Sequence, residues 1–491
     1  MLNVLVTIGA VQVLAMGVLL ARTKLLAVLL GPELVGVLAV VDKLVAVFVQ
    51  AASLSLPFAA IRFLPSFWEA GRAEFIRRLR AMSSTLVALS VVATVACVAL
   101  TALLPGLWGS ELEPHQFVLV LAFLTMPVQA LVPFIQNGLA ATFTPHRSML
   151  FYAAHAVVFT VTAGIGAAWA GLSGIYGLYA VAGTVLVATA LKRLNTPEGA
   201  VSAGPLGGAF RLPREIWRFG LALVALTFLA PYAALYVHYR VLSQLGAEAA
   251  GWMQAAMGLS LAVRAVLGAA HPIFLTPNVN RGGTPAERMA WAVAYQETLC
   301  LLIGLLLPPL LLFPDLAVQV LYSAEFLPGA RIVFLFVLME IVGLLAGTYQ
   351  AIVLALDRIA FHVAQNVAAQ LLMIAVGWAT IPRLGIAGAA LAALSSAVFL
   401  YAATTIFLAR RVGLRPPART TMLAAYLTIG LTLAGFVGRT PAAWSWEAIL
   451  WRLFVYLALL AGLRLFLTGE QQTKLRTLVR DAIGRVRSRP R

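Results

Sequence analysis

The chain has 491 residues, of which 62% are hydrophobic and 11% are charged, and its formal net charge is +17. An average soluble domain is about 25% charged, so this composition leaves too little polar surface to cover a globule of this size in water. A soluble globular protein is therefore excluded, and nucleic acid is not an expected partner because the basic residues stand in short segments between apolar runs.

Apolar runs of 18 residues or more recur along the whole chain, and each is long enough to cross the hydrocarbon core of a bilayer. The sequence thus predicts an all-α polytopic membrane protein with fourteen spans. In chain order they cover residues 3–28, 34–56, 81–104, 116–142, 148–170, 173–191, 217–239, 250–272, 290–312, 329–354, 359–381, 385–408, 420–438 and 447–467.

Most of the 35 basic residues fall in the segments after the even-numbered spans and in the C-terminal tail. Cytoplasmic loops carry an excess of Lys and Arg, so we expect this side, with both termini, to be cytoplasmic. The opposite segments are short and carry Glu111, Glu113, Asp315 and Glu325.

Two short motifs recur at nearly equal offsets. Leu30–Gly36 reads LGPELVG and Leu245–Gly251 reads LGAEAAG, while Gly174–Gly177 reads GIYG and Gly385–Gly388 reads GIAG. Six spans separate the members of each pair, so both halves have the same membrane orientation, as parallel repeats do. We therefore expect Gly31 to correspond to Gly246, and Gly174 to Gly385.

The repeat divides the chain into two six-helix lobes with additional C-terminal segments. The predicted units are an N-terminal lobe (1–193), a cytoplasmic linker (194–216), a C-terminal lobe (217–411), two further spans (412–467) and a tail (468–491). The tail places apolar residues at helical spacing among basic ones, which is typical of a helix on an anionic inner leaflet. Docking to a partner protein is the alternative for this tail.

No segment outside the spans is long enough to fold as a domain, and neither a Walker motif nor a GxGxxG after a predicted strand is present. Cys97 and Cys300 lie far apart in apolar runs and offer no metal-ligand spacing. We therefore expect a protein that is not an enzyme, with no catalytic residues, no cofactor and no metal.

Four segments carry a family resemblance. They are ARTKLLAVLLGPELVG (21–36), REIWRFGLALVALTFLAPYAALYVHYRVLSQLGAEAAG (214–251), LYSAEFLPGARIV (321–333) and IPRLGIAGAALAALSS (381–396). In this order the chain resembles the polysaccharide and O-antigen flippases of the multidrug/oligosaccharidyl-lipid/polysaccharide (MOP) exporter superfamily.

The resemblance implies two lobes forming a V and alternating access in the bacterial cytoplasmic membrane. The implied cargo is an undecaprenyl-pyrophosphate-linked oligosaccharide for surface polysaccharide assembly, with polysaccharide polymerases and glycosyltransferases as partners. Family members often have an acidic residue near the end of span seven, where this chain has His238, Tyr239 and Arg240. A coupling role for that acid is therefore not transferred.

Three alternatives stay open. A lipid II flippase of peptidoglycan synthesis shares the fourteen spans, but its characteristic N-terminal Arg- and Ser-rich motif is absent here. A drug/cation antiporter of the same superfamily usually has twelve spans and acidic binding sites. An intramembrane glycan-processing enzyme is disfavoured by the short outer segments.

Ionisable residues deep in a bilayer cost about 2.5–3.5 kcal/mol each on insertion scales, so each is a candidate for function. Lys43 in span two and Arg264 in span eight occupy equivalent helices, and we expect them to face one cavity and bind pyrophosphate. The alternative is an internal salt bridge between Arg264 and Asp42. Arg22 and Lys24, near the outer end of span one, either face the same cavity or extend to the headgroups.

Acidic and amide side chains in the spans complete the candidate site. Asp42, Glu297 and Glu340 could couple transport to H⁺ or Na⁺, or each could pair with a buried cation. The amides could hydrogen-bond sugar hydroxyls or join helices to one another. These amides are Gln129, Gln136, Asn137, Gln365 and Asn366.

Overall fold

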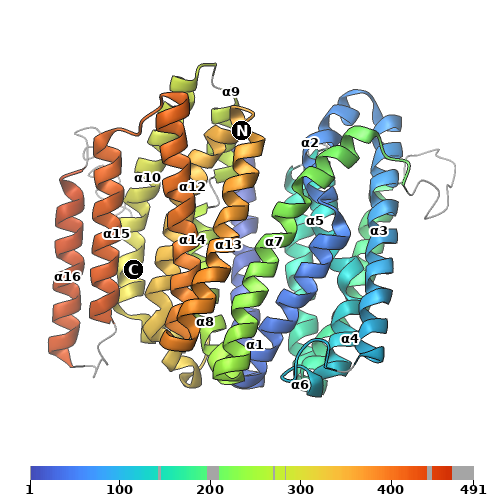
Figure 1. The fold of residues 1–491 in the computed structure, drawn as a ribbon, viewed down its shortest axis with the longest axis horizontal. Coiled ribbons are helices and arrows are strands. Elements are labelled where there is room, and N and C mark those ends of the chain that lie inside the picture. The colour runs from blue at the N-terminus through green and yellow to red at the C-terminus, as the bar shows by residue number, and fades with distance from the viewer. Residues whose placement is uncertain are drawn as a thin grey trace, which may run out of the picture.

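The computed structural model describes residues 2–104, 106–141, 145–195, 210–268, 271–281, 283–438 and 445–466. The described part is helical and has no strand (Figure 1). It contains 12 helices that are long and apolar enough to cross a membrane. The predicted tail (468–491) and most of the predicted linker lie outside the described residues.

The helices follow one another with short connections. They are α1 (Leu2–Ser53), α2 (Leu56–Glu69), α3 (Arg72–Leu103), α4 (Gln116–Leu124), α5 (Met126–Ala141), α6 (Pro145–Asn195), α7 (Arg214–Leu245), α8 (Ala247–Gly268), α9 (Thr276–Arg281), α10 (Pro285–Leu312), α11 (Pro314–Leu321), α12 (Val333–Ala355), α13 (Ile359–Leu384), α14 (Ile386–Phe407), α15 (Ala418–Gly438) and α16 (Trp446–Arg464). Short 3-10 segments are η1 (Glu113–His115) and η3 (Ala324–Ile332), and π-helical turns are η2 (His271–Leu275) and η4 (Leu408–Val412).

The two longest helical segments, α1 and α6, are each a hairpin of two helical arms. α1 has 52 residues and α6 has 51, and a straight helix of that length would extend about 75 Å, more than twice the hydrocarbon thickness. α1 is broken at Gly31, and α6 at Ala170 and Gly171. Because each folds back, the 12 apolar helices make the fourteen crossings that the hydropathy pattern predicts.

The internal repeat is visible in the backbone of the turn glycines. Gly31 (φ 68°, ψ 177°) and Gly246 (φ 90°, ψ 170°) share one left-handed conformation, as the LGxExxG motif predicts. Gly171 (φ 59°, ψ −137°) and Gly385 (φ 60°, ψ −137°) share another. These torsions favour glycine, because a Cβ would clash with the backbone at such φ values.

The predicted correspondence of Gly174 with Gly385 is wrong by three residues. Gly385 has the turn conformation of Gly171, and it is Gly388 that corresponds to Gly174. A Cβ at either of this second pair would overlap the backbone of the preceding helix, at Gly166 and Thr380 respectively. The letter match GIYG/GIAG therefore paired a turn glycine with a packing glycine.

The two lobes meet through backbone-to-backbone contact between the second arm of α1 and α8. A Cβ on Gly36 would overlap the carbonyl oxygen of Ala247, and a Cβ on Gly251 would overlap that of Pro32. Ala247 and Gly251 are the repeat equivalents of Pro32 and Gly36, so the contact is reciprocal, as at a two-fold axis. The turns at Gly31 and Gly246 place it at the lower end of the molecule in Figure 1.

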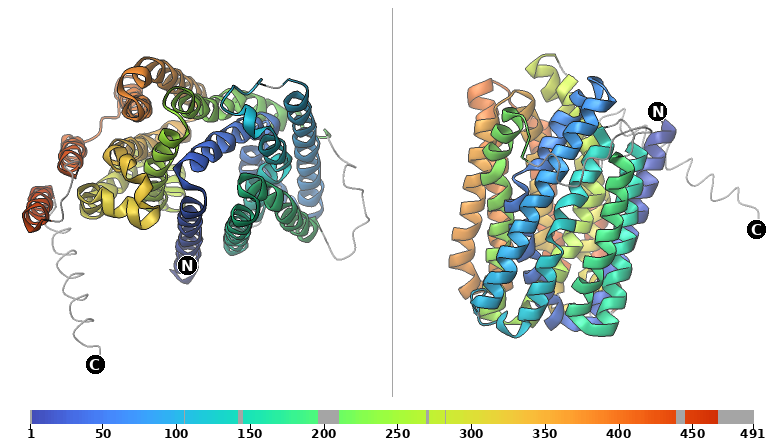
Figure 2. Two further views of the ribbon diagram at one scale, coloured as in Figure 1. Left: turned by 90° about the horizontal axis from the view of Figure 1, so that it is seen from below. Right: turned by 90° about the vertical axis from the view of Figure 1, so that its right-hand side faces the viewer.

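α7 contacts the first lobe along its length. Near its start, the ring of Phe219 packs edge-on against Phe63 of α2, and near its middle Thr227 shares a hydrogen bond of 2.9 Å with Ser55. Its last residues lead into the turn at Gly246, beside the α1–α8 contact. Figure 2 shows α7 between the two groups of helices. α7 therefore connects the lobes both in sequence and in space.

Segments expected as loops contain further helices. α2 follows span two, and α11 with η3 precede span ten. α2 begins after Leu54 and Ser55, whose positive φ values of 45° and 58° redirect the chain between α1 and α2. Hydropathy did not indicate these elements because they are shorter than a span.

Replacing Gly36 with alanine should destabilise the lobe contact. The added methyl would overlap the carbonyl of Ala247, so α1 and α8 must separate. We expect a lower melting temperature and a smaller monodisperse fraction in size-exclusion chromatography. Gly17→Ala in the same helix is the matched control, because nothing lies within 4 Å of its added Cβ. Equal stability of the two variants would contradict the backbone contact.

A cysteine near the start of α3 and a cysteine in η1 should react with a labelling reagent from opposite sides of the membrane. In a background where the buried Cys97 and Cys300 are serine, Arg77→Cys and Glu113→Cys place exposed thiols at the two ends. The charge distribution predicts that an impermeant maleimide reacts with Cys at position 113 in intact cells, and at position 77 only after permeabilisation. The reverse pattern would overturn the predicted orientation.

Candidate functional site

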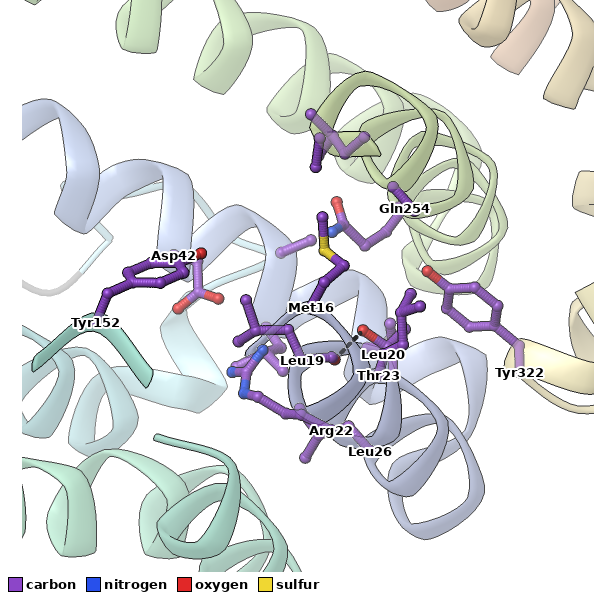
Figure 3. A pocket seen from close by; sticks show the side chains of 17 residues that line it. Met16, Leu19, Leu20, Arg22, Thr23, Leu26, Asp42, Tyr152, Gln254 and Tyr322 are labelled. Atoms are coloured by element: carbon purple, nitrogen blue, oxygen red, sulfur yellow. Dashed lines mark hydrogen bonds between the residues drawn. The ribbon is translucent and has the colours of Figure 1, made fainter. Parts of the chain in front are cut away.

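A cavity of about 340 Å³ lies between the lobes. Both arms of α1 and Tyr152 of α6 line it from the first lobe, and α8 and Tyr322 line it from the second (Figure 3). Most of the lining is leucine, valine, alanine and methionine. The polar side chains that reach it are Arg22, Thr23, Asp42, Tyr152, Gln254 and Tyr322.

Arg22 and Asp42 stand on opposite arms of the α1 hairpin and project toward the cavity. Oδ1 of Asp42 accepts a hydrogen bond of 2.7 Å from the hydroxyl of Tyr176, and the carboxylate interacts electrostatically with Arg22. The Arg22 guanidinium lies 3.9 Å from the ring centroid of Phe159. Its Nε is buried and has no hydrogen-bond partner among the described residues. Arg22 thus lines the cavity and carries one donor that the described residues leave unpartnered.

An aromatic group on α6 supports this guanidinium. Nε2 of His155 and the Tyr179 hydroxyl are 2.8 Å apart, and His155 stacks on Phe159. Phe159 in turn packs on Tyr179 at 4.8 Å between centroids. These contacts fix the orientation of the Phe159 ring on which the Arg22 guanidinium lies. The cation is therefore held by packing and by cation–π attraction.

Neither predicted lysine lines the cavity. Lys24 donates hydrogen bonds to the carbonyl oxygens of Gln319 and Tyr322, at the C-terminal end of α11 in the second lobe. It therefore joins the lobes at the end of their interface that holds the Gly36–Gly251 contact. Lys43 acts electrostatically on His238 of α7. Its predicted role in one cavity with Arg264 stays a prediction.

Arg264 pairs with Glu340 and not with Asp42. Its Nη1 lies 3.1 Å from Oε2 of Glu340, and the two side chains are 61% and 3% exposed. The pair connects α8 to α12 within the second lobe. The expected alternative, an Arg264–Asp42 bridge, is wrong because Tyr176 and Arg22 surround Asp42. Glu297 accepts a 3.0 Å hydrogen bond from Thr420, away from the cavity.

The predicted amide residues bond to the protein in this conformation. Asn137 donates to the carbonyl of Pro57 at 2.9 Å, and Gln365 accepts from Thr404 at 2.9 Å, so both join neighbouring helices. Gln129 donates to Thr125 and Asn366 to the carbonyl of His362. The main-chain carbonyl of Gln136 accepts a hydrogen bond from the Ser148 hydroxyl. Contact of these residues with sugar remains untested.

Four polar cavity residues escaped the sequence analysis, namely Thr23, Tyr152, Gln254 and Tyr322. Gln254 shares a face of α8 with Gly258, Leu261 and Ala265, and this spacing was the signal available. Tyr152 and Tyr322 carry no comparable signal, because aromatic residues occur throughout the spans. Gly258 allows the close approach of Tyr322, whose hydroxyl a Cβ would overlap.

No family model and no curated protein sequence matches the chain. Solved structures do. The lipid II flippase MurJ in an inward closed conformation matches with a TM-score of 0.71 at 11% identity, covering 92% of this chain and 98% of that chain. The chain therefore has the fold of this structure. An inward-facing MATE family multidrug transporter of the MOP superfamily matches with a TM-score of 0.51 at 15% identity, covering 84% and 95% of the chains.

These neighbours are transporters, and the likeness is one of fold. A MATE structure in complex with MaD5 also matches, with a TM-score of 0.50 at 14% identity over 86% of this chain and 96% of that one. The arrangement of helices in the present chain is therefore the one that these structures share. The neighbours do not determine its substrate.

Removing Arg264 alone should be more harmful than removing it together with Glu340. Arg264→Ala leaves a carboxylate buried without its partner, a change that costs about 3–5 kcal/mol for a fully buried pair and less here because Arg264 is half exposed. We expect a lower melting temperature, largely restored in the Arg264→Ala, Glu340→Gln double variant. No recovery in the double variant would show that Arg264 acts independently of Glu340.

Proposed function

We propose that this chain is a flippase that moves an undecaprenyl-pyrophosphate-linked oligosaccharide across the bacterial cytoplasmic membrane by alternating access of its two lobes. One observation carries the proposal. A guanidinium with an unpartnered, buried Nε faces a cavity between the lobes of a transporter fold. In this proposal the pyrophosphate of the lipid carrier supplies the missing acceptor.

The chemistry of Arg22 suits a pyrophosphate. Its planar guanidinium presents several N–H donors, which bind phosphate oxygens through short charge-assisted hydrogen bonds. Asp42 and Phe159 fix the guanidinium and offset part of the cost of holding its charge at this depth. Because the surrounding wall is apolar, the attraction between guanidinium and phosphate is weakly screened.

The size of the cavity limits what it holds in this conformation. A volume of about 340 Å³ is at the lower end of small-molecule sites, which hold about 300–1,000 Å³. It accommodates a diphosphate group but not an oligosaccharide. Transport of the complete lipid therefore requires the lobes to separate further, while the polyprenyl chain stays in the bilayer.

A lipid II cargo is the alternative with a specific observation in its favour. The lipid II flippase MurJ covers nearly the whole chain with a TM-score of 0.71. Both cargoes carry a polyprenyl pyrophosphate, so Arg22 serves either one. A drug/cation antiporter is less well supported, because Arg22 would repel a cationic drug in the cavity. Glycosyltransferases and a polysaccharide polymerase are the expected partners for the first cargo.

Arg22→Gln should abolish flipping. The glutamine retains a polar side chain but loses the charge and the guanidinium donors, so binding of a diphosphate should weaken by at least about tenfold. The measurement is translocation of a fluorescent undecaprenyl-pyrophosphate oligosaccharide in proteoliposomes. Arg464→Gln, at the exposed end of α16, is the matched control and should flip normally. Normal flipping by Arg22→Gln would refute the proposed anchor.

The same vesicles distinguish the two cargoes. We expect translocation of the oligosaccharide-linked carrier to be slowed by excess unlabelled carrier with the same glycan, and little affected by lipid II. Competition by lipid II alone would assign the alternative function while leaving the role of Arg22 intact.

A further inference from the structure

His238 of α7 lies at the junction of the lobes, 1% exposed, where the family resemblance predicts an acid. Its Nδ1 is 2.8 Å from the carbonyl oxygen of Ala234, and its Nε2 is 3.4 Å from Oε1 of Gln254. Gln254 belongs to α8 and lines the cavity, with its side chain projecting toward Met16 (Figure 3). A buried titratable ring thus contacts a residue of the binding cavity.

The two hydrogen bonds define what the ring requires of Gln254. A carbonyl oxygen only accepts, so Nδ1 of His238 must carry a proton in either charge state. In the neutral ring Nε2 is then an acceptor and needs the NH₂ group of Gln254. In the imidazolium Nε2 is a donor and needs Oε1. Each protonation state of His238 therefore selects one orientation of the amide.

The amide orientation changes what the cavity offers to an anion. When the NH₂ group turns to His238, the Gln254 oxygen is the group left for the cavity, and an anion is repelled. When Oε1 turns to His238, the NH₂ group is left and can donate to a phosphate oxygen. We propose that His238 is a proton-binding site that is linked to anion binding through the amide of Gln254. This inference rests on the proposed function, because it requires an anionic ligand in the cavity.

The charged group that faces His238 from α1 is Lys43, which acts electrostatically on the ring across the lobe junction. On α8 the contacting group is Gln254, which does not titrate, and α13 approaches α7 at this level with Gly377 against Val237. Asp42 and Arg22 stand at the cavity. An anion bound in the cavity offsets the positive field of Lys43 at His238. The anion-bound protein therefore binds a proton at His238 more tightly, and the protonated protein binds the anion more tightly.

Reciprocity makes the inference measurable as proton uptake. Purified full-length protein is titrated with farnesyl pyrophosphate in a calorimeter, in buffers of different ionisation enthalpy between pH 6 and pH 8. The native chain should take up more protons on binding than His238→Phe or His238→Gln, and its affinity should rise about tenfold more than theirs as the pH falls. Protons taken up by the diphosphate itself are common to all variants and cancel in the comparison.

Two further variants separate the relay from general effects. Gln254→Met keeps the histidine but removes the amide, and it should lose the excess proton uptake. His362→Phe, in the first turn of α13 and outside the cavity lining, should behave as the native chain. Because His238→Phe could fail to fold, His238→Gln provides the same test with a polar side chain.

The outcomes distinguish the inference from the function beneath it. Equal proton uptake and equal pH dependence in the native chain and in both folded His238 variants would overturn the linkage, even where binding still depends on Arg22. No binding of farnesyl pyrophosphate by the native chain would instead overturn the proposed function. If Gln254→Met still takes up more protons on binding than the His238 variants do, the role of the amide is refuted.

Discussion

The architecture depends on the close approach of α1 and α8 at Gly36 and Gly251. Between helices in lipid there is little hydrophobic driving force, so association relies on packing, and small residues permit the tightest packing. Here the two glycines allow backbone to touch backbone reciprocally. The cavity begins directly beyond this contact, because residues 35–42 of α1 and 254–265 of α8 are continuations of the same two helices. The contact therefore sets the separation of the cavity walls.

Charges at membrane depth are satisfied here in different ways, and the differences separate structural from functional candidates. Lys24 donates two hydrogen bonds to carbonyls of the other lobe, and Arg264 has a buried carboxylate as its partner. Arg22 has an aromatic ring, a neighbouring acid and one donor that the described residues leave unpartnered. Depth alone marks all three as costly, and of the three it is Arg22 that lines the cavity between the lobes.

The fold was largely predictable from the sequence, and the candidate site only in part. Span length and hydrophobicity follow from bilayer thickness, and the turn glycines carry the repeat, so the fourteen crossings and the equivalence of Gly31 and Gly246 could be found. The rotation of each helix about its axis could not, because most spans are apolar on every side. Which of the candidate cations line the cavity could consequently not be predicted, and Gln254 was overlooked. The partner of Arg264 lies 76 residues away and required the packing of α8 on α12.

The two ends of the lobe interface are built from different contacts, which bears on how the lobes could move. At the end near the turns at Gly31 and Gly246, the backbone contact and the hydrogen bonds of Lys24 to carbonyls hold α1 against α8 and α11. Toward the other end, α7 contacts the first lobe through side chains such as Phe219. α7 also contains Pro231 in its middle, where a helix loses a hydrogen bond and bends most readily. A bend there would let the second lobe rotate while the start of α7 stays on α2. His238 lies two turns beyond this proline, so the rotation would displace the ring relative to Lys43. The same movement would thereby change the electrostatic environment of His238, which contacts the cavity residue Gln254.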